Sequence, residues 1–315
     1  MSASPSLKIV LGSRGSELAR TQTAMVELAL RQAWPELEIF TEIIKTRGDD
    51  RQMEPIDPHA GRKGLFTGEI ERALSAGEID IAVHSAKDLP SEAAMGLELR
   101  TLPRAAVDDV LIRKTVGGLA SLRPNAVVAT GSVRRQHQLR RQRPDLEIID
   151  LRGNVPTRLR KLVASDWDAI ILARAGIERL GYNLSTGRFD FEGATLFGEI
   201  LSRDEFVPAG GQGVIAMQLR SDDEKAKKLA DSVSDKSTLL CLRAEREFLR
   251  LLHGDCDSPV GVLATIENNE MTLSTQVFMQ DNAAPKISKV LRRPLLTEKP
   301  ETVAELLHNF MYAQR

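Results

Sequence analysis

Basic side chains concentrate in one short segment of this chain, where they could bind an anion. Residues 131–161 contain nine basic residues against three acidic ones, an excess of six in a chain of net charge −1. Its clusters Ser132-Val133-Arg134-Arg135 and Arg152-Gly153-Asn154 follow apolar runs and precede helical patterns, where helix N-termini offer N–H groups beside guanidinium forks. We therefore expect a site for a ligand with several carboxylates. The alternative is a solvated basic face, above all at Arg140, Arg141 and Arg143.

A Lys-Asp pair follows another apolar run and could stabilise a positive charge. The run that starts at Asp80 leads into Lys87-Asp88, at the kind of strand end where α/β enzymes hold reactive groups. Lys87 would keep Asp88 ionised, which suits a carboxylate that stabilises a cation. The alternative is a surface ion pair beside a buried His84.

Of the two cysteines, only Cys256 lies where a nucleophile would be accessible. It stands in a Gly- and Pro-containing turn sequence before a strand pattern, whereas Cys241 falls within an apolar helical pattern typical of a core. A zinc site formed by His253, Asp255, Cys256 and Asp257 is disfavoured because a second ligand pair is missing. Two cysteines without CxxC spacing indicate reduced thiols rather than a disulfide framework.

Composition indicates a folded protein of two or three domains. Of 315 residues, 42% are hydrophobic and 28% charged, which excludes collagen-like, disordered and disulfide-scaffold classes. The near-neutral charge and the lack of aromatic residues among the arginines disfavour nucleic acid as a partner. Since neither a signal-peptide core nor a stretch of about 18 apolar residues occurs, we expect a cytoplasmic protein that binds no membrane.

The elements that must position these residues alternate between strand and helix. Strands are predicted at 7–11, 37–43 and 79–84, with helices through Leu18, Met25 and Leu28 and over 64–74. This order implies a parallel sheet covered by helices on both faces. The same pattern restarts at residue 125, with strands predicted at 126–130, 146–151 and 169–173. Residues 183–205 show no clear period and predict a connector.

Three domains follow from these patterns. The first comprises residues 1–104 and 204–221, because a strand at 214–219 could return to the first sheet. The second comprises residues 105–203. The third, residues 222–315, has an α+β pattern with helices predicted at 223–232, 237–252 and 301–312 and strands at 260–266, 271–279 and 288–292.

Nine short motifs cover nearly the whole chain. They are Gly12-Ser-Arg-Gly-Ser16, Lys45-Thr-Arg-Gly-Asp49, Lys63-Gly-Leu-Phe66, Asp80-Ile-Ala-Val-His-Ser-Ala-Lys-Asp-Leu-Pro90, Gly131-Ser-Val-Arg-Arg-Gln136, Leu151-Arg-Gly-Asn-Val155 with Thr157-Arg-Leu159, Ala175-Gly-Ile-Glu-Arg-Leu-Gly181, Pro208-Ala-Gly-Gly-Gln-Gly213 and Cys256 with Pro259-Val-Gly261. They occur in the order found in the porphobilinogen deaminase family, whose members are also called hydroxymethylbilane synthases, and the chain therefore resembles this family.

The resemblance implies a transferase of tetrapyrrole and haem biosynthesis. It implies an α/β fold in which two domains, similar to the halves of a type II periplasmic binding protein, flank a cleft beside a small α+β third domain. It also implies a dipyrromethane cofactor, held through a thioether by Cys256. Four porphobilinogen units are added to the free end of this cofactor, each losing ammonia to give an azafulvene, and hydrolysis releases hydroxymethylbilane. No metal is implied, and a monomer is favoured.

The matched motifs also imply roles for single residues. Asp88, with Lys87, is the catalytic carboxylate that faces the pyrrole N–H groups and stabilises the positive charge formed on deamination. The residues implied to contact the cofactor are Lys87, Asp88, Ser132, Arg134, Arg135 and, covalently, Cys256. Those implied to contact the substrate are Arg14, Ser16, Arg152, Arg158, Arg179 and Lys63, the last on a lid expected over 49–63.

Several positions depart from the family pattern. His59 and Arg62 stand where Lys and Gly are common, and Asp255 replaces the usual Gly before Cys256. Together with Asp257, it should disfavour the thiolate and slow cofactor loading. The usual Asp-Pro-Arg-Asp segment is reduced to Val107-Asp108-Asp109. Outside this family, the alternatives are a non-catalytic anion-binding module and, less favoured, a nucleic-acid-binding protein.

Overall fold

The computed structural model describes residues 7–46, 67–92, 94–253, 258–278, 285–294 and 299–312. Contacts divide the chain into two compact units. Unit 1 is formed by residues 1–104 and 214–242, and unit 2 by residues 105–213 and 243–315. Across the described residues, no helix combines the length and the apolar character needed to cross a membrane.

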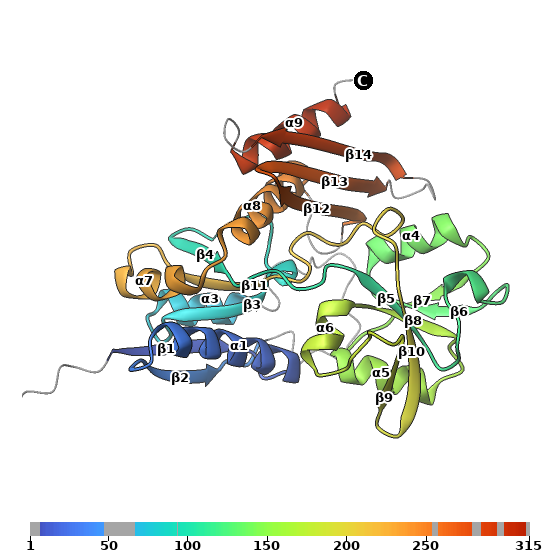
Figure 1. The fold of residues 1–315 in the computed structure, drawn as a ribbon, viewed down its shortest axis with the longest axis horizontal. Helices are drawn as coiled ribbons and strands as arrows, with labels where there is room; N and C mark the ends of the chain where they lie inside the picture. The colour runs from blue at the N-terminus through green and yellow to red at the C-terminus, as the bar shows by residue number, and fades with distance from the viewer. Residues whose placement is uncertain are drawn as a thin grey trace, which may run out of the picture. The chain divides into compact units, whose positions relative to one another are not determined.

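Unit 1 is built on a five-stranded sheet of order β2-β1-β3-β11-β4 (Figure 1). Its strands are β1 (Lys8–Ser13), β2 (Glu38–Ile43), β3 (Ile81–Ser85), β4 (Leu97–Thr101) and β11 (Ile215–Arg220). β1 runs parallel to β2 and β3, while β11 runs antiparallel to β3 and β4. The predicted return of the chain to the first sheet is confirmed. The predicted parallel pairing is confirmed for β1, β2 and β3, whereas the returning strand β11 runs in the opposite direction to its neighbours.

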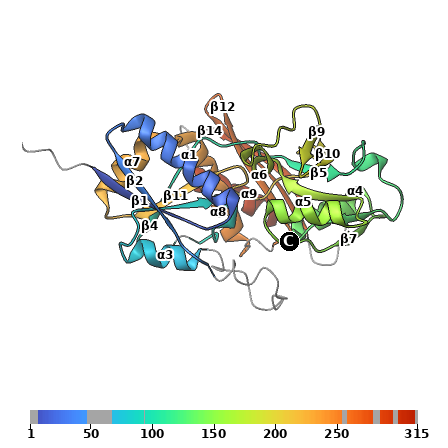
Figure 2. The ribbon, with the colours of Figure 1, turned by 90° about the horizontal axis from the view of Figure 1, so that it is seen from below.

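Helices cover both faces of this sheet, as predicted. They are α1 (Glu17–Ala33), α3 (Gly68–Ser75) and α7 (Glu224–Val233), with a short 3₁₀ helix η1 (Ala86–Asp88) after β3. Val26 of α1 and Leu229 of α7 share one core cluster with β1, whereas Leu74 of α3 belongs to another. Figure 2 shows α1 and α3 on opposite sides of the strands. Helix α7, expected in the third domain, packs into the core of unit 1 because Ala226 and Leu229 lie on its buried face.

The buried face of α1 differs from the predicted one. Met25 and Leu28 are 40% and 58% exposed, so the apolar spacing that predicted this helix does not mark its core side. The residues that it buries are Gln22, Thr23, Val26 and Leu30. The buried side of α1 therefore contains the polar residues Gln22 and Thr23, whereas the apolar residues Met25 and Leu28 lie outside it.

Unit 2 contains a six-stranded sheet of order β7-β6-β8-β5-β10-β9. The strands are β5 (Asp109–Arg113), β6 (Val127–Ala129), β7 (Glu147–Ile149), β8 (Ala169–Ala173), β9 (Arg188–Phe191) and β10 (Ala194–Ile200). The helices around it are α4 (Val133–Gln142), α5 (Val155–Ala164), α6 (Arg174–Arg179) and the 3₁₀ helix η2 (Leu119–Ser121). β6 is parallel to β7 and β8, as predicted, and each of these strands is followed by a helix or a helical turn.

The predicted connector over 183–205 is wrong, because β9 and β10 form an antiparallel hairpin there. Glu192 and Gly193 make its turn with φ angles of 47° and 84°. Phe189 and Phe191 point into the core while Asp190 is exposed. A strand of four residues is too short for this alternation to stand out in a sequence.

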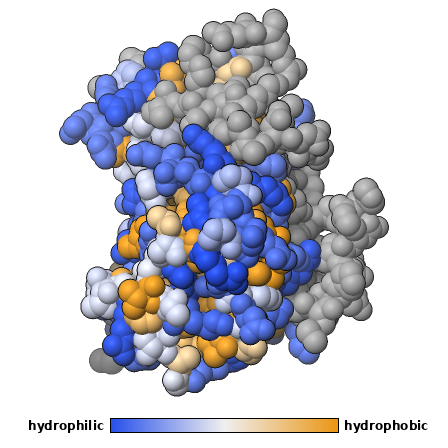
Figure 3. Space-filling model, turned by 90° about the vertical axis from the view of Figure 1, so that its right-hand side faces the viewer, coloured by the Kyte–Doolittle hydropathy of each residue, from blue (hydrophilic) through white to orange (hydrophobic). Residues whose placement is uncertain are grey.

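The C-terminal part of unit 2 is a three-stranded antiparallel sheet with a helix, and this α+β prediction is confirmed. Its elements are β12 (Val260–Glu267), β13 (Glu270–Phe278), β14 (Pro285–Pro294) and α9 (Pro300–Tyr312), after helix α8 (Lys236–Leu251). Asn268 and Asn269 turn β12 into β13 with φ angles of 50° and 63°. Figure 3 shows one face of the molecule, where hydrophilic side chains predominate and hydrophobic ones are interspersed.

Candidate functional site

In unit 1, the ends of two neighbouring parallel strands carry the predicted site residues. β1 ends at Ser13, Arg14 follows half-buried, and Ser16 caps α1 by accepting a hydrogen bond from the Ala19 N–H at 3.3 Å. β3 ends at Ser85 and leads into η1, which carries Lys87 and Asp88. Because β1 and β3 pair in parallel, their carboxyl ends lie at the same edge of the sheet.

Asp88 and Lys87 have different surroundings. The Asp88 side chain is exposed, whereas Lys87 is half-buried. An exposed carboxylate at the end of a strand can approach a ligand without moving the backbone. The alternative that made His84 a buried neighbour is compatible with the structure, since His84 is only 6% exposed.

His84 is held neutral beneath these residues. Burial lowers its pKa to about 4, and the charge of Arg14 acts in the same direction, against a hydrogen bond to Gln218 that raises it. A neutral imidazole adds no charge to the region between Arg14 and Asp88.

In unit 2, Arg134 and Arg135 start α4 and bind a buried carboxylate. Arg134 Nη1 and Arg135 Nη2 each lie 2.7 Å from one oxygen of Asp109, the first residue of β5. Arg134 also donates to the carbonyl of Val207, and Gln212 donates to Asp109 at 2.9 Å. Burial alone would raise the pKa of Asp109, but the two guanidinium groups lower it well below its usual range.

The alternative of a solvated basic face does not hold for Arg134 and Arg135, which are 3% and 5% exposed. Their predicted contact with a ligand stays a prediction. Arg140 and Arg141 on the same helix are exposed, as that alternative expected, while Arg143 is paired with Asp145.

Two further helix starts carry predicted residues. Ser132 accepts a hydrogen bond from the Arg135 N–H at 3.5 Å, and Asn154 accepts one from the Thr157 N–H at 2.9 Å, so each caps its helix. Arg158 Nε donates to the Gly153 carbonyl at 2.7 Å. Arg152 is partly exposed and pairs with the exposed Asp150.

Gly153 allows the chain to turn sharply before α5. Its φ angle is +114°, and a Cβ there would lie 2.8 Å from Thr157 Cγ2. Only glycine takes this conformation without strain while leaving Thr157 in place. The Arg-Gly-Asn order of the motif therefore has a structural cause.

Arg179 is the clearest indication of an anionic ligand. Its Nη2 donates to the Gly213 carbonyl at 2.7 Å, while its Nε is buried without a hydrogen-bond partner within the described part of the chain. Burial lowers its pKa to about 10. No carboxylate of the described residues forms an ion pair with it, so a ligand carboxylate would satisfy a cation that the protein leaves desolvated.

Sequence reasoning missed the residues that hold these groups in place. Asp108 and Asp109 were noted only as part of a segment that departs from the family pattern. In the structure, Asp108 accepts a hydrogen bond from Arg203 at 2.6 Å. Gln22, Thr23 and Gln212 were not singled out. For the two aspartates, an adjacent acidic pair at the start of an apolar run was a usable signal.

Some predicted residues lie outside the described ranges. Lys63, with the expected lid at 49–63, and Cys256 are among them, as are His59, Arg62, Asp255 and Asp257. Cys241 is buried in α8, which confirms its prediction as a core residue.

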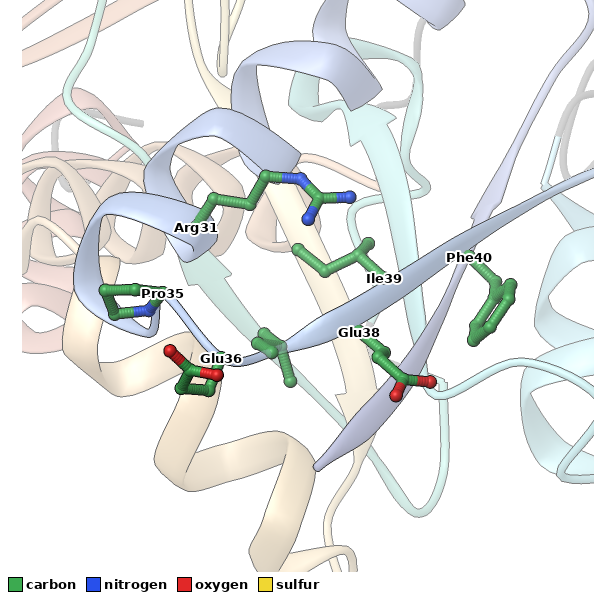
Figure 4. Close-up of a pocket in the computed structure, with 7 residues that line it drawn as sticks. Arg31, Pro35, Glu36, Glu38, Ile39 and Phe40 are labelled. Atoms are coloured by element: carbon green, nitrogen blue, oxygen red, sulfur yellow. The ribbon is translucent and has the colours of Figure 1, made fainter. Parts of the chain in front are cut away.

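A surface depression at the end of α1 contains none of the predicted residues. It is lined by Arg31, Leu37 and Ile39 together with the residues Pro35, Glu36, Glu38 and Phe40. Figure 4 shows Pro35 and Glu36 at the turn between α1 and β2. Its ionisable side chains, Arg31, Glu36 and Glu38, belong to none of the motifs that predicted the site.

Comparisons with known proteins find the same family across most of the chain. The family model described as "Porphobilinogen deaminase, dipyromethane cofactor binding domain" matches residues 9–228, and "Porphobilinogen deaminase, C-terminal domain" matches residues 239–312. The porphobilinogen deaminase of Roseiflexus sp. (strain RS-1) is 44% identical over 277 residues, which cover 87% of this chain and 86% of that protein. That of Chloroherpeton thalassium is 39% identical over 298 residues, or 94% and 90% of the two chains.

Among solved structures, the chain is similar to regulatory and effector-binding domains at low sequence identity. The effector binding domain of BenM with its effector benzoate aligns with a TM-score of 0.43 and 13% identity, over 73% of this chain and 91% of that chain. The α/β architecture of this protein therefore rests on its own sheets and helices.

Proposed function

Because this chain belongs to the porphobilinogen deaminase family, we propose that Asp88 and the arginines described above carry the reaction of that family. The chain is a transferase that joins four porphobilinogen molecules head to tail on a dipyrromethane cofactor and releases hydroxymethylbilane for tetrapyrrole biosynthesis. The cofactor supplies the pyrrole end to which the units are joined.

The residues present fit a cofactor and a substrate that carry acetate and propionate groups. The buried Nε of Arg179, which lacks an acceptor within the described ranges, is the observation that carries this assignment. Residues proposed to hold the dipyrromethane are Lys87, Asp88, Ser132, Arg134, Arg135 and, through a thioether, Cys256. Residues proposed to bind porphobilinogen are Arg14, Ser16, Arg152, Arg158, Arg179 and Lys63.

Asp88 acts where positive charge develops. When ammonia leaves the aminomethyl carbon of porphobilinogen, the C–N bond breaks and the charge spreads onto the pyrrole nitrogen. A fixed carboxylate beside that N–H stabilises the charged state more than the neutral one. The bound cofactor would supply the pyrrole carbon to which the new C–C bond forms, with loss of the proton of that carbon.

Asp109 supports this chemistry from within unit 2. Its two oxygens bind Arg134 and Arg135, which fixes both side chains against β5 and β8. Preorganised cations cost less side-chain entropy when a ligand binds. We assign Asp109 to positioning, since it is itself fully buried.

The domain division also stays a proposal. The predicted domains are residues 1–104 with 204–221, residues 105–203 and residues 222–315. We change this division only by assigning α7 to the first domain, because it packs into the core of unit 1. The pairing of β11 with β3 and β4 supports the discontinuous first domain, and the separate sheet of β12, β13 and β14 supports the third. A monomeric, cytoplasmic enzyme that binds no nucleic acid is proposed from the family resemblance and the net charge of −1.

The mass of the intact protein tests this assignment. We expect the purified chain to exceed its sequence mass by one dipyrromethane, and Arg179→Leu to raise the KM for porphobilinogen by about 10-fold or more. Arg188→Leu, a substitution of an exposed arginine paired with Asp190, serves as the matched control and should leave the KM unchanged. An unmodified mass in active protein would overturn the cofactor assignment.

A further inference from the structure

Helix α1 buries polar side chains at the level where β1 and β3 end. Gln22 and Thr23 are 3% and 2% exposed, whereas the next buried positions on the same face, Val26 and Leu30, are apolar. Burying an amide and a hydroxyl costs free energy unless both find partners, and threonine is a poor helix former. An apolar pair would cover the sheet at lower cost, so the polar pair needs another explanation.

Gln22 binds the last residue of β3 through two hydrogen bonds. Its Nε2 lies 2.9 Å from Ser85 Oγ and donates to it, and Ser85 Oγ donates back to Gln22 Oε1 at 3.0 Å. Ser85 directly precedes η1, which carries Lys87 and Asp88. The side chain of Gln22 thereby fixes the point from which this turn departs.

Thr23 binds the end of the neighbouring strand. Its Oγ1 donates to Ser13 Oγ at 2.8 Å, and Ser13 Oγ donates to the carbonyl of Arg14 at 3.1 Å. Ser13 is completely buried and is the last residue of β1. Two adjacent residues of one helix thus hold the two strand ends from which Arg14 and Asp88 extend.

We propose that Gln22 and Thr23 are separate positioning residues for the reaction, Gln22 for the turn with Asp88 and Thr23 for Arg14. The proposal rests on the roles given above to Asp88 and Arg14. It implies that the two neighbours affect different kinetic constants. Displacing Asp88 weakens charge stabilisation in the transition state and lowers kcat, while displacing Arg14 weakens binding of a substrate carboxylate and raises KM.

The test compares Gln22→Met with Thr23→Val, which keep the side-chain size and remove the hydrogen bonds. Gln22→Met should lower kcat about 10-fold with KM little changed, and Thr23→Val should raise KM about 5-fold with kcat little changed. Ser85→Ala should reproduce Gln22→Met. The double variant Gln22→Met/Ser85→Ala should have a kcat no lower than that of either single variant, because both substitutions remove the same interaction.

A second readout does not depend on turnover. Amide hydrogen exchange in a peptide that covers residues 86–89 should accelerate in Gln22→Met but not in Thr23→Val. Val26→Ala is the matched control, since it lies on the same buried face without a polar contact. It should lower the unfolding midpoint and leave kcat, KM and exchange at 86–89 close to those of the parent.

The outcomes separate this inference from the assignment of the site. If Gln22→Met and Thr23→Val change kcat and KM no more selectively than Val26→Ala, while Asp88→Asn still lowers kcat by at least about 100-fold, the positioning roles are overturned and the site assignment stands. If Asp88→Asn itself keeps normal turnover, the assignment of Asp88 fails. Accelerated amide exchange at 86–89 in Gln22→Met would then still establish that Gln22 holds the turn. Unchanged exchange would reject this positioning role of Gln22.

Discussion

Arg134 Nη1 lies 2.7 Å from Asp109 Oδ2, and the two side chains are 3% and 0% exposed. Asp109→Asn would leave two buried guanidinium groups without their carboxylate. Removing one partner of a buried ion pair costs roughly 3–5 kcal/mol, so we expect a loss of that order in the free energy of unfolding. Urea denaturation at pH 7.5 measures it.

Asp145→Asn is the control for this prediction. Asp145 forms a comparable 2.7 Å pair with Arg143, but at the surface, where water screens the two charges and the pair contributes little to stability. Equal losses in the two variants would show that burial of the Asp109 cluster has no special effect on stability.

Because His84 is buried, the free energy of unfolding should decrease as the pH falls. Burial lowers its folded pKa to about 4 from a reference value of 6.5, so the unfolded chain binds the proton more readily. The stabilisation is complete above pH 6.5 and is lost as the pH falls toward 4. Between pH 7.5 and 5 the free energy of unfolding should decrease by about 2 kcal/mol from this group.

Denaturation of His84→Gln at the two pH values isolates the contribution of the imidazole. The variant should lose about 2 kcal/mol less than the parent between pH 7.5 and 5. A parent and a variant with the same pH dependence would mean that His84 is protonated equally in both states.

Asp88→Asn should fold normally and lose at least about 100-fold in kcat, since one electrostatic stabiliser contributes about 3 kcal/mol. Its exposed position predicts an unchanged unfolding midpoint. The assay uses cofactor-loaded protein, with loading checked by intact mass. Asp88→Glu retains the charge at a displaced position and should lose less. Turnover within a few-fold of the parent in Asp88→Asn would make this residue structural.

Cys256→Ser should abolish hydroxymethylbilane synthesis because a hydroxyl is a much poorer nucleophile than a thiolate at neutral pH. Cys241→Ser should keep the cofactor, since Cys241 is buried in α8. Peptide mapping identifies the modified residue. An adduct on Cys241, or active protein without any adduct, would contradict the assignment.

The sequence predicted those parts of the fold that depend on local pattern. The strands predicted at 260–266 and 271–279 form β12 and β13, and Asn268 and Asn269 make the turn between them. The strand at 214–219 was predicted from a run of apolar residues. Its antiparallel direction was not predicted, because the direction depends on the path of the 113 residues between β4 and β11 and not on the strand itself.

The site was less predictable where it depends on tertiary contacts. The motifs predicted Arg14, Arg179 and Asp88 as site residues. They did not predict which side chains surround these residues. Gln22 shows the reason: a polar residue in a helix normally indicates an exposed face, and the apolar Met25 and Leu28 beside it suggested a different buried side. Only the serine at the end of β3 explains why an amide is buried there.

The late arrival of β11 has a consequence for synthesis on the ribosome. β3 and β4 are complete by residue 101, but the strand that separates them begins at residue 215, which the ribosome reaches roughly 6 to 20 s later. Until then, the backbone N–H and C=O groups of β3 and β4 that pair with β11 in the finished protein have no strand to bind. Such edges recruit strands from other chains. The nascent N-terminal half of this enzyme therefore lacks the strand that pairs with both β3 and β4 in the finished protein.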